Sequence, residues 1–412
     1  MTKEFITKFA NSVGEVFDNN KSVLIARDTR ETGQVIEKWI TEVLIAKGFN
    51  IHIAEVLPTP GMSYILRDGN FSLGIMITAS HNPYTDNGIK LFGDNGYKLD
   101  SQIESLIEEK ILKDNFDTFR QNFGKKIVLE NCFENYIDSI SKQYPAISCD
   151  KKILVDCSNG AYSNLKNVIS IENIRFINCE PNGNNINLEC GALHSEKLLD
   201  KVIHDNYDFG VSFDGDGDRA IFVSKNYGEI ESEKLAILFF ASSSRTNLKV
   251  VSSEIANFAL KRNLEKFGAH LIETPVGDRF IVNYVRDEEA FFGFEPSGHF
   301  HFPDKTNSMD GFISLMKFLE LISVYGDKVN HKLTKLEHYE RVQENISIKD
   351  LENIDLSILK NKVATYIDST NERLIIRKSM WDPVIRLYYD YIKKNNYKFI
   401  KENINKIIED KK

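Results

Sequence analysis

Residues 77–83 read Ile-Thr-Ala-Ser-His-Asn-Pro, and the apolar run from Leu73 to Ile77 leads directly into them. A short apolar run with polar residues on both sides is typical of a buried strand. Asn82 and Pro83 then indicate a turn. The pattern therefore predicts that the hydroxyl group of Ser80 lies at the carboxyl end of a strand, where open α/β sheets bind their ligands.

Two other interpretations of Ser80 need weighing. Serine, asparagine and proline are turn-forming residues first, so Ser80 could do no more than help to form the turn. A hydrolase nucleophile would need one glycine two residues before the serine and another two residues after it. Thr78 and Asn82 stand at those positions, so the local sequence argues against a hydrolase elbow.

A second polar loop, Asp214-Gly215-Asp216-Gly217-Asp218-Arg219, follows the apolar run from Phe209 to Phe213. Its three carboxylates would repel one another unless a hard divalent cation lay between them. An EF-hand calcium loop would need glycine at its sixth position and glutamate at its twelfth. Arg219 and Lys225 stand there, so the pattern favours a magnesium site with room for a phosphate oxygen.

These two loops, with Asn87-Gly88-Ile89-Lys90 after the first, resemble the phosphoserine and metal loops of the α-D-phosphohexomutases. The family includes phosphoglucomutase, phosphomannomutase and phosphoglucosamine mutase. The resemblance implies an α/β fold of three similar mixed-sheet α/β domains plus a small C-terminal α+β domain, arranged around a central cleft. The expected domains are residues 1–145 with the phosphoserine loop, 146–228 with the metal loop, 229–335 with a sugar-binding loop and 336–412 with a phosphate-binding loop.

Composition restricts the class of protein further. The chain has 412 residues, a formal net charge of −8 and 42% hydrophobic residues, enough for a large core and too long for one ordinary domain. The acidic balance argues against a nucleic-acid partner, and no run is long enough to span a membrane. The N-terminus, Met-Thr-Lys-Glu-Phe, does not read as a signal peptide. Five cysteines without a C-x-x-C pair indicate reduced thiols, so we expect a cytoplasmic protein.

The resemblance implies roles for the residues of the first two loops. Ser80 would carry a phosphoryl group, and Mg²⁺ would bind to Ser80, Asp214, Asp216 and Asp218. Arg219 would stabilise the phosphoryl group during transfer. Lys90 and His81 are both candidates for the general base, and Lys90 is the favoured one.

Two loops of the predicted third domain match the sugar side of the family's site. Glu295-Pro296-Ser297-Gly298-His299 resembles the G-E-x-S-G-H loop, in which Glu295, Ser297 and His299 would bind sugar hydroxyls. Gly277 and Asp278 lie in a substrate-side loop at the predicted start of a helix, where Asp278 would also suit an N-cap. Arg27 and Arg30 match a segment near the family's active site.

The last loop, residues 376–386, resembles the family's phosphate-binding loop and keeps Arg377, Ser379 and Arg386. It departs from the family by having Met380-Trp381 where Gly-Thr is usual, which could mark a changed substrate. The family's Gly-Thr-x-Gly-x-Arg-Gly loop, which usually precedes the first helix, is not found in this sequence. The chain is expected to start at the helix that follows that loop.

The resemblance therefore implies an isomerase that moves a phosphoryl group between O6 and O1 of a hexose phosphate through a phosphoserine and a bisphosphate intermediate. The N-I-N-x-x-C-G-x-x-H motif at residues 185–194 is closest to the phosphoglucosamine mutase subgroup, so glucosamine 6-phosphate and glucosamine 1-phosphate are the expected pair. Two alternatives stay open: action on another hexose phosphate, or a catalytically weak paralogue that binds sugar phosphate. Mg²⁺ and a hexose 1,6-bisphosphate activator are the expected cofactors, and the protein would be a monomer or homodimer.

Overall fold

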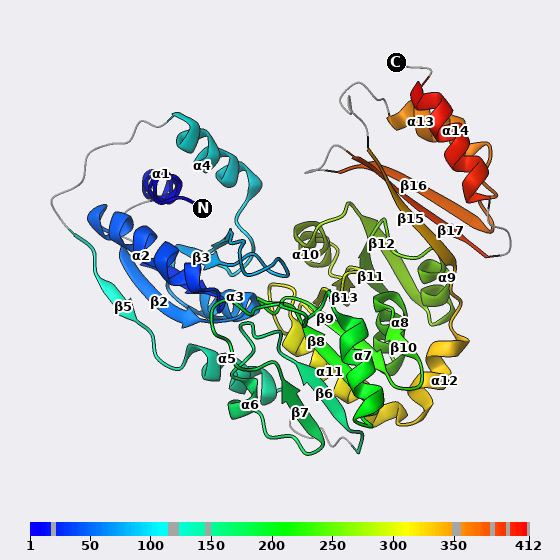
Figure 1. The fold of residues 1–412 in the computed structure, drawn as a ribbon, viewed down its shortest axis with the longest axis horizontal. Coiled ribbons are helices and arrows are strands. Elements are labelled where there is room, and N and C mark those ends of the chain that lie inside the picture. The colour runs from blue at the N-terminus through cyan, green and yellow to red at the C-terminus, as the bar shows by residue number, and fades with distance from the viewer. Residues whose placement is uncertain are drawn as a thin grey trace.

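The structure is a computed structural model that describes residues 1–17, 22–113, 123–144, 150–347, 356–379, 384–392 and 396–409. Its described strands form four sheets, each with helices packed beside it. Figure 1 shows the first three sheets side by side in the lower body and the fourth at the upper right. We call these parts the first to fourth units, in chain order.

The first unit is built on the sheet β4-β3-β1-β2-β5, in which β4 is the antiparallel edge strand. Its buried strand β3 runs from Leu73 to Ile77, as the sequence predicts. The elements of this unit are α1 (Lys3–Val16), β1 (Ser22–Arg27), α2 (Glu31–Ala46), β2 (Asn50–Val56), α3 (Thr59–Asp68), β3 (Leu73–Ile77), β4 (Ile89–Gly93), α4 (Ser101–Lys113), β5 (Lys126–Val128) and α5 (Cys132–Ser141).

The sequence Pro58-Thr59-Pro60 predicts a turn, because proline is a turn-forming residue. This prediction is wrong, since Thr59 begins helix α3. Proline is tolerated in the first turn of a helix, because the backbone N–H groups there have no intrahelical partner in any case. This early helix start matters for the site, because it places Thr59 beside the metal loop.

The second unit has the sheet β10-β9-β8-β6-β7, with β6 parallel to β7 and β8 and with β9 antiparallel to β8. The strand before the acidic loop, β8, covers Phe209–Phe213 as predicted and is wholly buried. The elements are β6 (Ile153–Asp156), α6 (Leu165–Val168), β7 (Ile174–Ile177), α7 (Ser195–His204), β8 (Phe209–Phe213), β9 (Ala220–Ser224) and β10 (Gly228–Ile230).

The third unit has the mixed sheet β12-β11-β13-β14. Its elements are α8 (Ser232–Ser242), β11 (Leu248–Ser253), α9 (Ala259–Lys266), β12 (Ala269–Thr274), α10 (Asp278–Asp287), β13 (Phe292–Phe294), β14 (Phe300–His301), α11 (Gly311–Tyr325) and α12 (Lys328–Lys335).

The fourth unit has the antiparallel sheet β15-β17-β16. Its elements are β15 (Glu340–Ser347), α13 (Leu356–Ala364), β16 (Glu372–Lys378), β17 (Val384–Tyr391) and α14 (Tyr397–Glu409). The predicted fold class is confirmed, and the domain limits stay a prediction.

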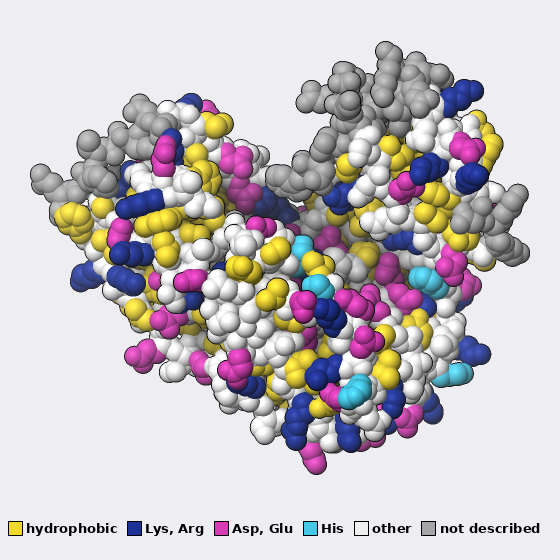
Figure 2. Space-filling view, in the orientation of Figure 1, with side chains coloured by type: hydrophobic (Ala, Val, Ile, Leu, Met, Phe, Trp, Pro, Cys, Tyr) yellow, Lys and Arg dark blue, Asp and Glu magenta, His cyan; other side chains and the backbone are white. Residues whose placement is uncertain are grey.

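One large apolar core joins the first three units, whereas the fourth has a core of its own. Helix α11 contributes to the shared core, since Phe318 packs against Phe209 and Phe222 of the second unit at ring-centroid distances of 5.3 and 4.7 Å. Figure 2 shows a deep notch between the first and fourth units. The shared core therefore fixes the base of this notch, and the separate fourth unit forms one wall.

Helix α11 begins with a buried acid. Asp310 is its N-cap, and its carboxylate accepts hydrogen bonds from Ile313 N at 2.9 Å and from the Tyr136 hydroxyl at 2.7 Å. Burial raises the pKa of Asp310 to about 6, against an ordinary value of 3.8. A carboxyl group whose pKa is raised on folding stabilises the folded state below its unfolded pKa, and this contribution is lost as the pH rises through the folded pKa.

We therefore expect Asp310→Asn to gain stability relative to the wild type as the pH rises from 4 to 7. Asparagine keeps an oxygen for the helix cap but never becomes charged. The raised pKa of Asp310 therefore corresponds to a change of about 3 kcal/mol in the free energy of unfolding of the variant relative to the wild type. Urea unfolding of both proteins at pH 4, 5.5 and 7 measures it. Asp304→Asn, at an exposed acid, is the control and should not reproduce this change. A stability difference between Asp310→Asn and the wild type that does not change with pH would contradict the prediction.

Candidate functional site

The structure brings Ser80 directly against the acidic loop. The Ser80 hydroxyl donates to Asp214 Oδ2 at 2.7 Å, although the two residues are 134 positions apart. Ser80 has a φ of 51°, and its backbone N–H donates to Thr78 Oγ1 at 2.9 Å. This left-handed conformation is uncommon for a residue other than glycine, so the surrounding structure must stabilise it. The serine is therefore held in a specific orientation, which an ordinary turn would not require.

Arg30 stabilises this loop by hydrogen bonds to its backbone. Its side chain is wholly buried, and its Nε lies 2.9 Å from Asp28 Oδ2. The guanidinium donates to four carbonyl oxygens of the serine loop, those of Ser80, Asn82, Pro83 and Asp86. The other arginine of the predicted segment, Arg27, lies with its Nε 3.3 Å from Glu37 Oε2 on α2. The two arginines thus differ: Arg30 holds the serine loop, and Arg27 pairs with a helix of its own unit.

The three carboxylates of the acidic loop form a buried cluster. Each of Asp214, Asp216 and Asp218 offers an oxygen within 4.8 Å of the others. Burial and the two neighbouring carboxylates raise the pKa of Asp214 to about 7. Among the described residues, Asp216 Oδ1 is buried without a hydrogen-bond partner. A buried oxygen without a donor, beside two further carboxylates, fits a hard divalent cation, which takes oxygen ligands.

Lys90 lies against the same cluster. Its Nζ is 2.6 Å from Asp216 Oδ2 and 2.8 Å from Asp218 Oδ2. Although burial opposes it, attraction to these carboxylates raises the pKa of Lys90, which keeps the lysine protonated. A divalent cation would compete with the ammonium group for the same oxygens, so cation binding and the charge of Lys90 are coupled.

His81, the other predicted proton acceptor, has the opposite charge state. Burial, followed by the charge of Arg219, lowers the pKa of His81 to about 4, so its ring is neutral at pH 7. Its Nδ1 lies 3.3 Å from the Ser80 hydroxyl oxygen. His81 is therefore in a state that can accept a proton, and Lys90 would have to lose its carboxylate partners first. The structure thus places His81 beside the serine and Lys90 against the carboxylate cluster.

The predicted sugar loop meets the acidic loop through a histidine. His299 Nε2 lies 3.2 Å from Asp218 Oδ1, and its Nδ1 lies 3.1 Å from Glu295 Oε2. Although burial opposes it, these carboxylates raise the pKa of His299 to about 9. Ser297 Oγ is 3.0 Å from the same Nδ1, and Gly277 N donates to Glu295 Oε1 at 2.9 Å. The ends of β3, β8 and β13 thus converge on one place.

Gly277 and Asp278 lie on the side of this site where the first and third units meet. Gly277, with a φ of 137°, is the N-cap of α10, so the suggestion that Asp278 is the cap is wrong. Asp278 forms an ion pair with Lys98 of the first unit instead. Both side chains line a hollow that Asp218 also lines. Asp278 therefore faces the space beside the carboxylate cluster.

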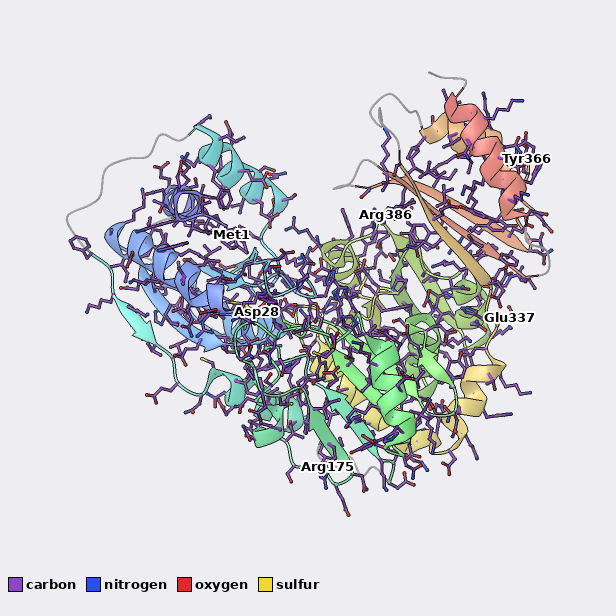
Figure 3. The ribbon with its side chains drawn as sticks, viewed as in Figure 1. Met1, Asp28, Arg175, Glu337, Tyr366 and Arg386 are labelled. Atoms are coloured by element: carbon purple, nitrogen blue, oxygen red, sulfur yellow. The ribbon has the colours of Figure 1, made fainter. Side chains whose placement is uncertain are left out.

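Arg377, Ser379 and Arg386 come together in the fourth unit. Arg377 and Arg386 are cross-strand neighbours on β16 and β17, and Arg386 Nη2 lies 3.3 Å from Ser379 Oγ. Figure 3 labels Arg386 in the fourth unit and Asp28 in the first unit. Met380-Trp381, the predicted departure from the family loop, lies outside the described residues. Two adjacent guanidinium groups and a hydroxyl can bind a phosphate group.

The sequence analysis assigned no role to two residues that contact these loops. Thr59 donates its hydroxyl hydrogen to Asp216 Oδ2, and its backbone N–H donates to Asp216 O at 2.9 Å. Asn187 donates from Nδ2 to Ser80 O at 2.9 Å and to Asn82 O at 3.1 Å. Thr59 gave no signal, because its flanking prolines read as a turn. Asn187 stands in the quoted N-I-N motif, whose contact with the serine loop exists only in the folded chain.

Comparison with known proteins places this fold and site among enzymes that move phosphoryl groups on sugars. Residues 1–118 match the model of phosphoglucomutase/phosphomannomutase alpha/beta/alpha domain I, and residues 231–339 match the model of domain III. Phosphoglucosamine mutase of Staphylococcus aureus is 30% identical over 430 residues, which cover 100% of this chain and 95% of that protein. These matches span both the serine loop and the sugar loop.

Solved structures show the same fold. A phosphoglucomutase/phosphomannomutase family protein from Burkholderia thailandensis has a TM-score of 0.83 at 20% identity, covering 100% of this chain and 94% of that one. The N-acetylphosphoglucosamine mutase of Aspergillus fumigatus, solved with GlcNAc-6P and magnesium, has a TM-score of 0.68 at 13% identity. It covers 86% of this chain and 91% of that one.

The fold and the serine–carboxylate site together define an isomerase that transfers a phosphoryl group within a sugar phosphate. The chain belongs to the α-D-phosphohexomutase family, and it is a hexose phosphate mutase. No helix in the described part of the chain is long and apolar enough to cross a membrane.

Proposed function

We propose that this mutase interconverts glucosamine 6-phosphate and glucosamine 1-phosphate, with Ser80 as the phosphoryl carrier. The contact between the Ser80 hydroxyl and Asp214 Oδ2, 2.7 Å long within a buried carboxylate cluster, is the observation that carries the proposal. The name of the Staphylococcus aureus relative supports glucosamine phosphate as the substrate. The enzyme would work in the cytoplasm, as a monomer or homodimer.

Asp214, Asp216 and Asp218, together with Ser80, would hold Mg²⁺. When bound, the ion would offset negative charge on the phosphoryl group in flight. Hexose 1,6-bisphosphate is the proposed activator, because it supplies the first phosphoryl group to Ser80.

Proton and charge transfer fall to the chain's own residues. The phosphoryl group passes from Ser80 Oγ to a sugar hydroxyl, and the proton of that hydroxyl goes to a base. His81, whose lowered pKa leaves it neutral, suits that role, and Lys90 would suit it once it has left its carboxylates and lost its own proton. The base then gives this proton to the Ser80 oxygen, which has lost its bond to phosphorus. After the bisphosphate has turned over in the site, its other phosphate is transferred to Ser80 Oγ, and the proton of Ser80 passes to the sugar oxygen that the phosphate leaves. Arg219 stabilises the equatorial oxygens of the phosphoryl group during both transfers.

The sugar and its non-reacting phosphate require separate contacts, because the bisphosphate must bind in two orientations. Sugar hydroxyls and the amino group would be bound from the third unit by Glu295, Ser297, His299, Gly277 and Asp278. The phosphate that is not reacting would be bound from the fourth unit by Arg377, Ser379 and Arg386. Arg30 would act by holding the serine loop, and Arg27 would lie at its edge.

The proposal is tested by following glucosamine 6-phosphate and glucosamine 1-phosphate with Mg²⁺ and a trace of glucosamine 1,6-bisphosphate. We expect turnover in both directions and a kcat/KM for glucosamine phosphates above that for glucose or mannose phosphates. A preference for either of those sugars would move the proposal to a different substrate. If every sugar phosphate only binds and Ser80 takes up no phosphoryl group, the catalytically weak paralogue would be the better description.

The fourth-unit site gives a further prediction. We expect Arg386→Met to raise the KM for glucosamine 6-phosphate by about 10- to 100-fold, because a charge-assisted contact to phosphate contributes about 1.5–3 kcal/mol. A contact kept in both the ground state and the transition state should leave kcat within a few-fold of the wild type. Initial-rate kinetics measure this split. Arg262→Met, at an exposed contact with Thr370 O, is the control and should change neither value. A fall in kcat at constant KM would contradict the assignment.

A further inference from the structure

The loop around the N-I-N motif crosses from the second unit to the serine of the first. Asn187 has a φ of 57°, and its Nδ2 donates to Ser80 O and Asn82 O at 2.9 and 3.1 Å. Among the described residues, its Oδ1 is buried without a hydrogen-bond partner. A buried amide oxygen without a donor costs free energy, so the side chain is placed there at a cost to stability. The two hydrogen bonds that the amide group donates offset this cost.

Both carbonyl groups already have a donor from their own unit. Arg30 Nη2 donates to Ser80 O and to Asn82 O, each at 2.9 Å. Each carbonyl oxygen thus accepts one hydrogen bond from the first unit and one from the second, which uses both of its lone pairs. Asn187 therefore fixes the serine loop relative to the unit that carries the carboxylates, which Arg30 alone does not do.

The packing leaves little freedom at this junction. A Cβ atom on Gly215, in the acidic loop, would lie 2.6 Å from Ser80 O and 2.8 Å from Asn187 Nδ2. Only glycine lets the acidic loop approach so closely. Ser80 meanwhile keeps the left-handed conformation that directs its hydroxyl to Asp214. The hydrogen bonds to its carbonyl oxygen hold this conformation together with the bond that its own N–H donates to Thr78 Oγ1.

We propose that Asn187 is a positioning residue for the nucleophile, which keeps Ser80 in the left-handed conformation that directs its hydroxyl group at the carboxylate cluster. The inference rests on the proposed role of Ser80 as phosphoryl carrier. Asn187 does not touch the reacting atoms; it acts through the Ser80 backbone. A small change in the direction of the hydroxyl group costs rate, because phosphoryl transfer needs the attacking and leaving oxygens in line.

Two variants distinguish the effect of the Asn187 side-chain amide from the effect of the left-handed backbone at this position. Asn187→Gly removes the amide but accepts the positive φ without strain, and Asn187→Asp keeps the shape but turns a carboxylate oxygen toward two carbonyl oxygens. Asn206→Gly is the matched control, since Asn206 also has a positive φ, 59°, on an exposed turn after α7. Each protein is assayed for kcat and KM, and hydrogen–deuterium exchange is followed in the peptide covering residues 79–86.

Both Asn187 variants are expected to lose kcat by about 10²-fold while KM stays within about twofold, and amide exchange in residues 79–86 should speed up. The control should match the wild type in all three measurements. Wild-type kcat or unchanged exchange in Asn187→Gly would overturn the inference. If the wild type itself shows no turnover, the proposed function fails separately, and the exchange rates alone decide whether Asn187 holds the loop.

Discussion

Ser80→Ala is expected to lower the interconversion of glucosamine 6-phosphate and glucosamine 1-phosphate by at least about 10³-fold. The hydroxyl oxygen is the atom that would accept and return the phosphoryl group, so no other side chain can replace it in a relay of two transfers. Alanine keeps the Cβ atom at this strained position, and Arg30 and Asn187 still bind the carbonyl oxygen. The loss should therefore be chemical and should leave the fold intact.

The measurement combines initial rates with intact mass after incubation with glucosamine 1,6-bisphosphate. The wild type should gain the mass of one phosphoryl group, and Ser80→Ala should gain none. Thr85→Ala is the matched control, because Thr85 carries an exposed hydroxyl in the same loop. It should keep both activity and phosphorylation. Phosphorylation of Ser80→Ala, or activity above about a tenth of the wild type, would exclude Ser80 as the carrier.

Asp214→Asn is expected to weaken Mg²⁺ binding by at least about 10²-fold and to lower kcat with it. Asparagine can keep the hydrogen bonds that Asp214 Oδ1 accepts from Gly217 N and Arg219 N. It removes one of three buried negative charges that lie within 4.8 Å of one another. The loop should therefore stay folded while losing a ligand charge for the cation.

The stabilisation by Mg²⁺ should also depend on pH, and the pKa of Asp214 determines in which direction. In the absence of a divalent cation, the pKa of Asp214 is raised to about 7 from 3.8, so its neutral form favours the folded state. That contribution is present below pH 3.8 and is lost as the pH rises through about 7. A bound cation favours the ionised form. The thermal shift produced by Mg²⁺ should thus grow between pH 5.5 and 8 in the wild type.

Differential scanning calorimetry with Mg²⁺ or with a chelator measures this shift, and Mg²⁺ titration by isothermal calorimetry measures affinity. In Asp214→Asn the shift should be small at every pH, and the chelated variant should be more stable than the chelated wild type at pH 8. Asp68→Asn, at an exposed acid on α3, is the control and should behave like the wild type. An equal Mg²⁺ shift in wild type and Asp214→Asn would show that the cation does not bind at this cluster.

Much of the fold can be predicted from short apolar runs and from the polar loops that follow them in the sequence. The runs ending at Ile77 and Phe213 are strands with the predicted bounds, because a five-residue buried strand has a strong local signal. Pro58-Thr59-Pro60 shows the limit of such reading. Its prolines fit a turn and a first helical turn equally well, and packing decides between the two.

The sequence by itself determined which chemical groups the site contains. Ser80 and three alternating aspartates stand at the ends of apolar runs, and this arrangement predicts a phosphoryl carrier beside a cation site. Local spacing predicts the hydroxyl group and the cation site, because each loop is a continuous segment, and the resemblance to the family's loops adds the role of phosphoryl carrier.

Only the tertiary structure decided which groups touch. It paired Lys90 with Asp216 and Asp218, and it placed Thr59 against Asp216. It also directed the Arg30 guanidinium to the carbonyl oxygens of the serine loop. It also brought the Asn187 amide to the Ser80 carbonyl across 107 positions of sequence. Such contacts depend on how one sheet packs on the next, and a local pattern carries no information about the distance between two strand ends. That packing of three units around one shared core makes separate loops into a single site.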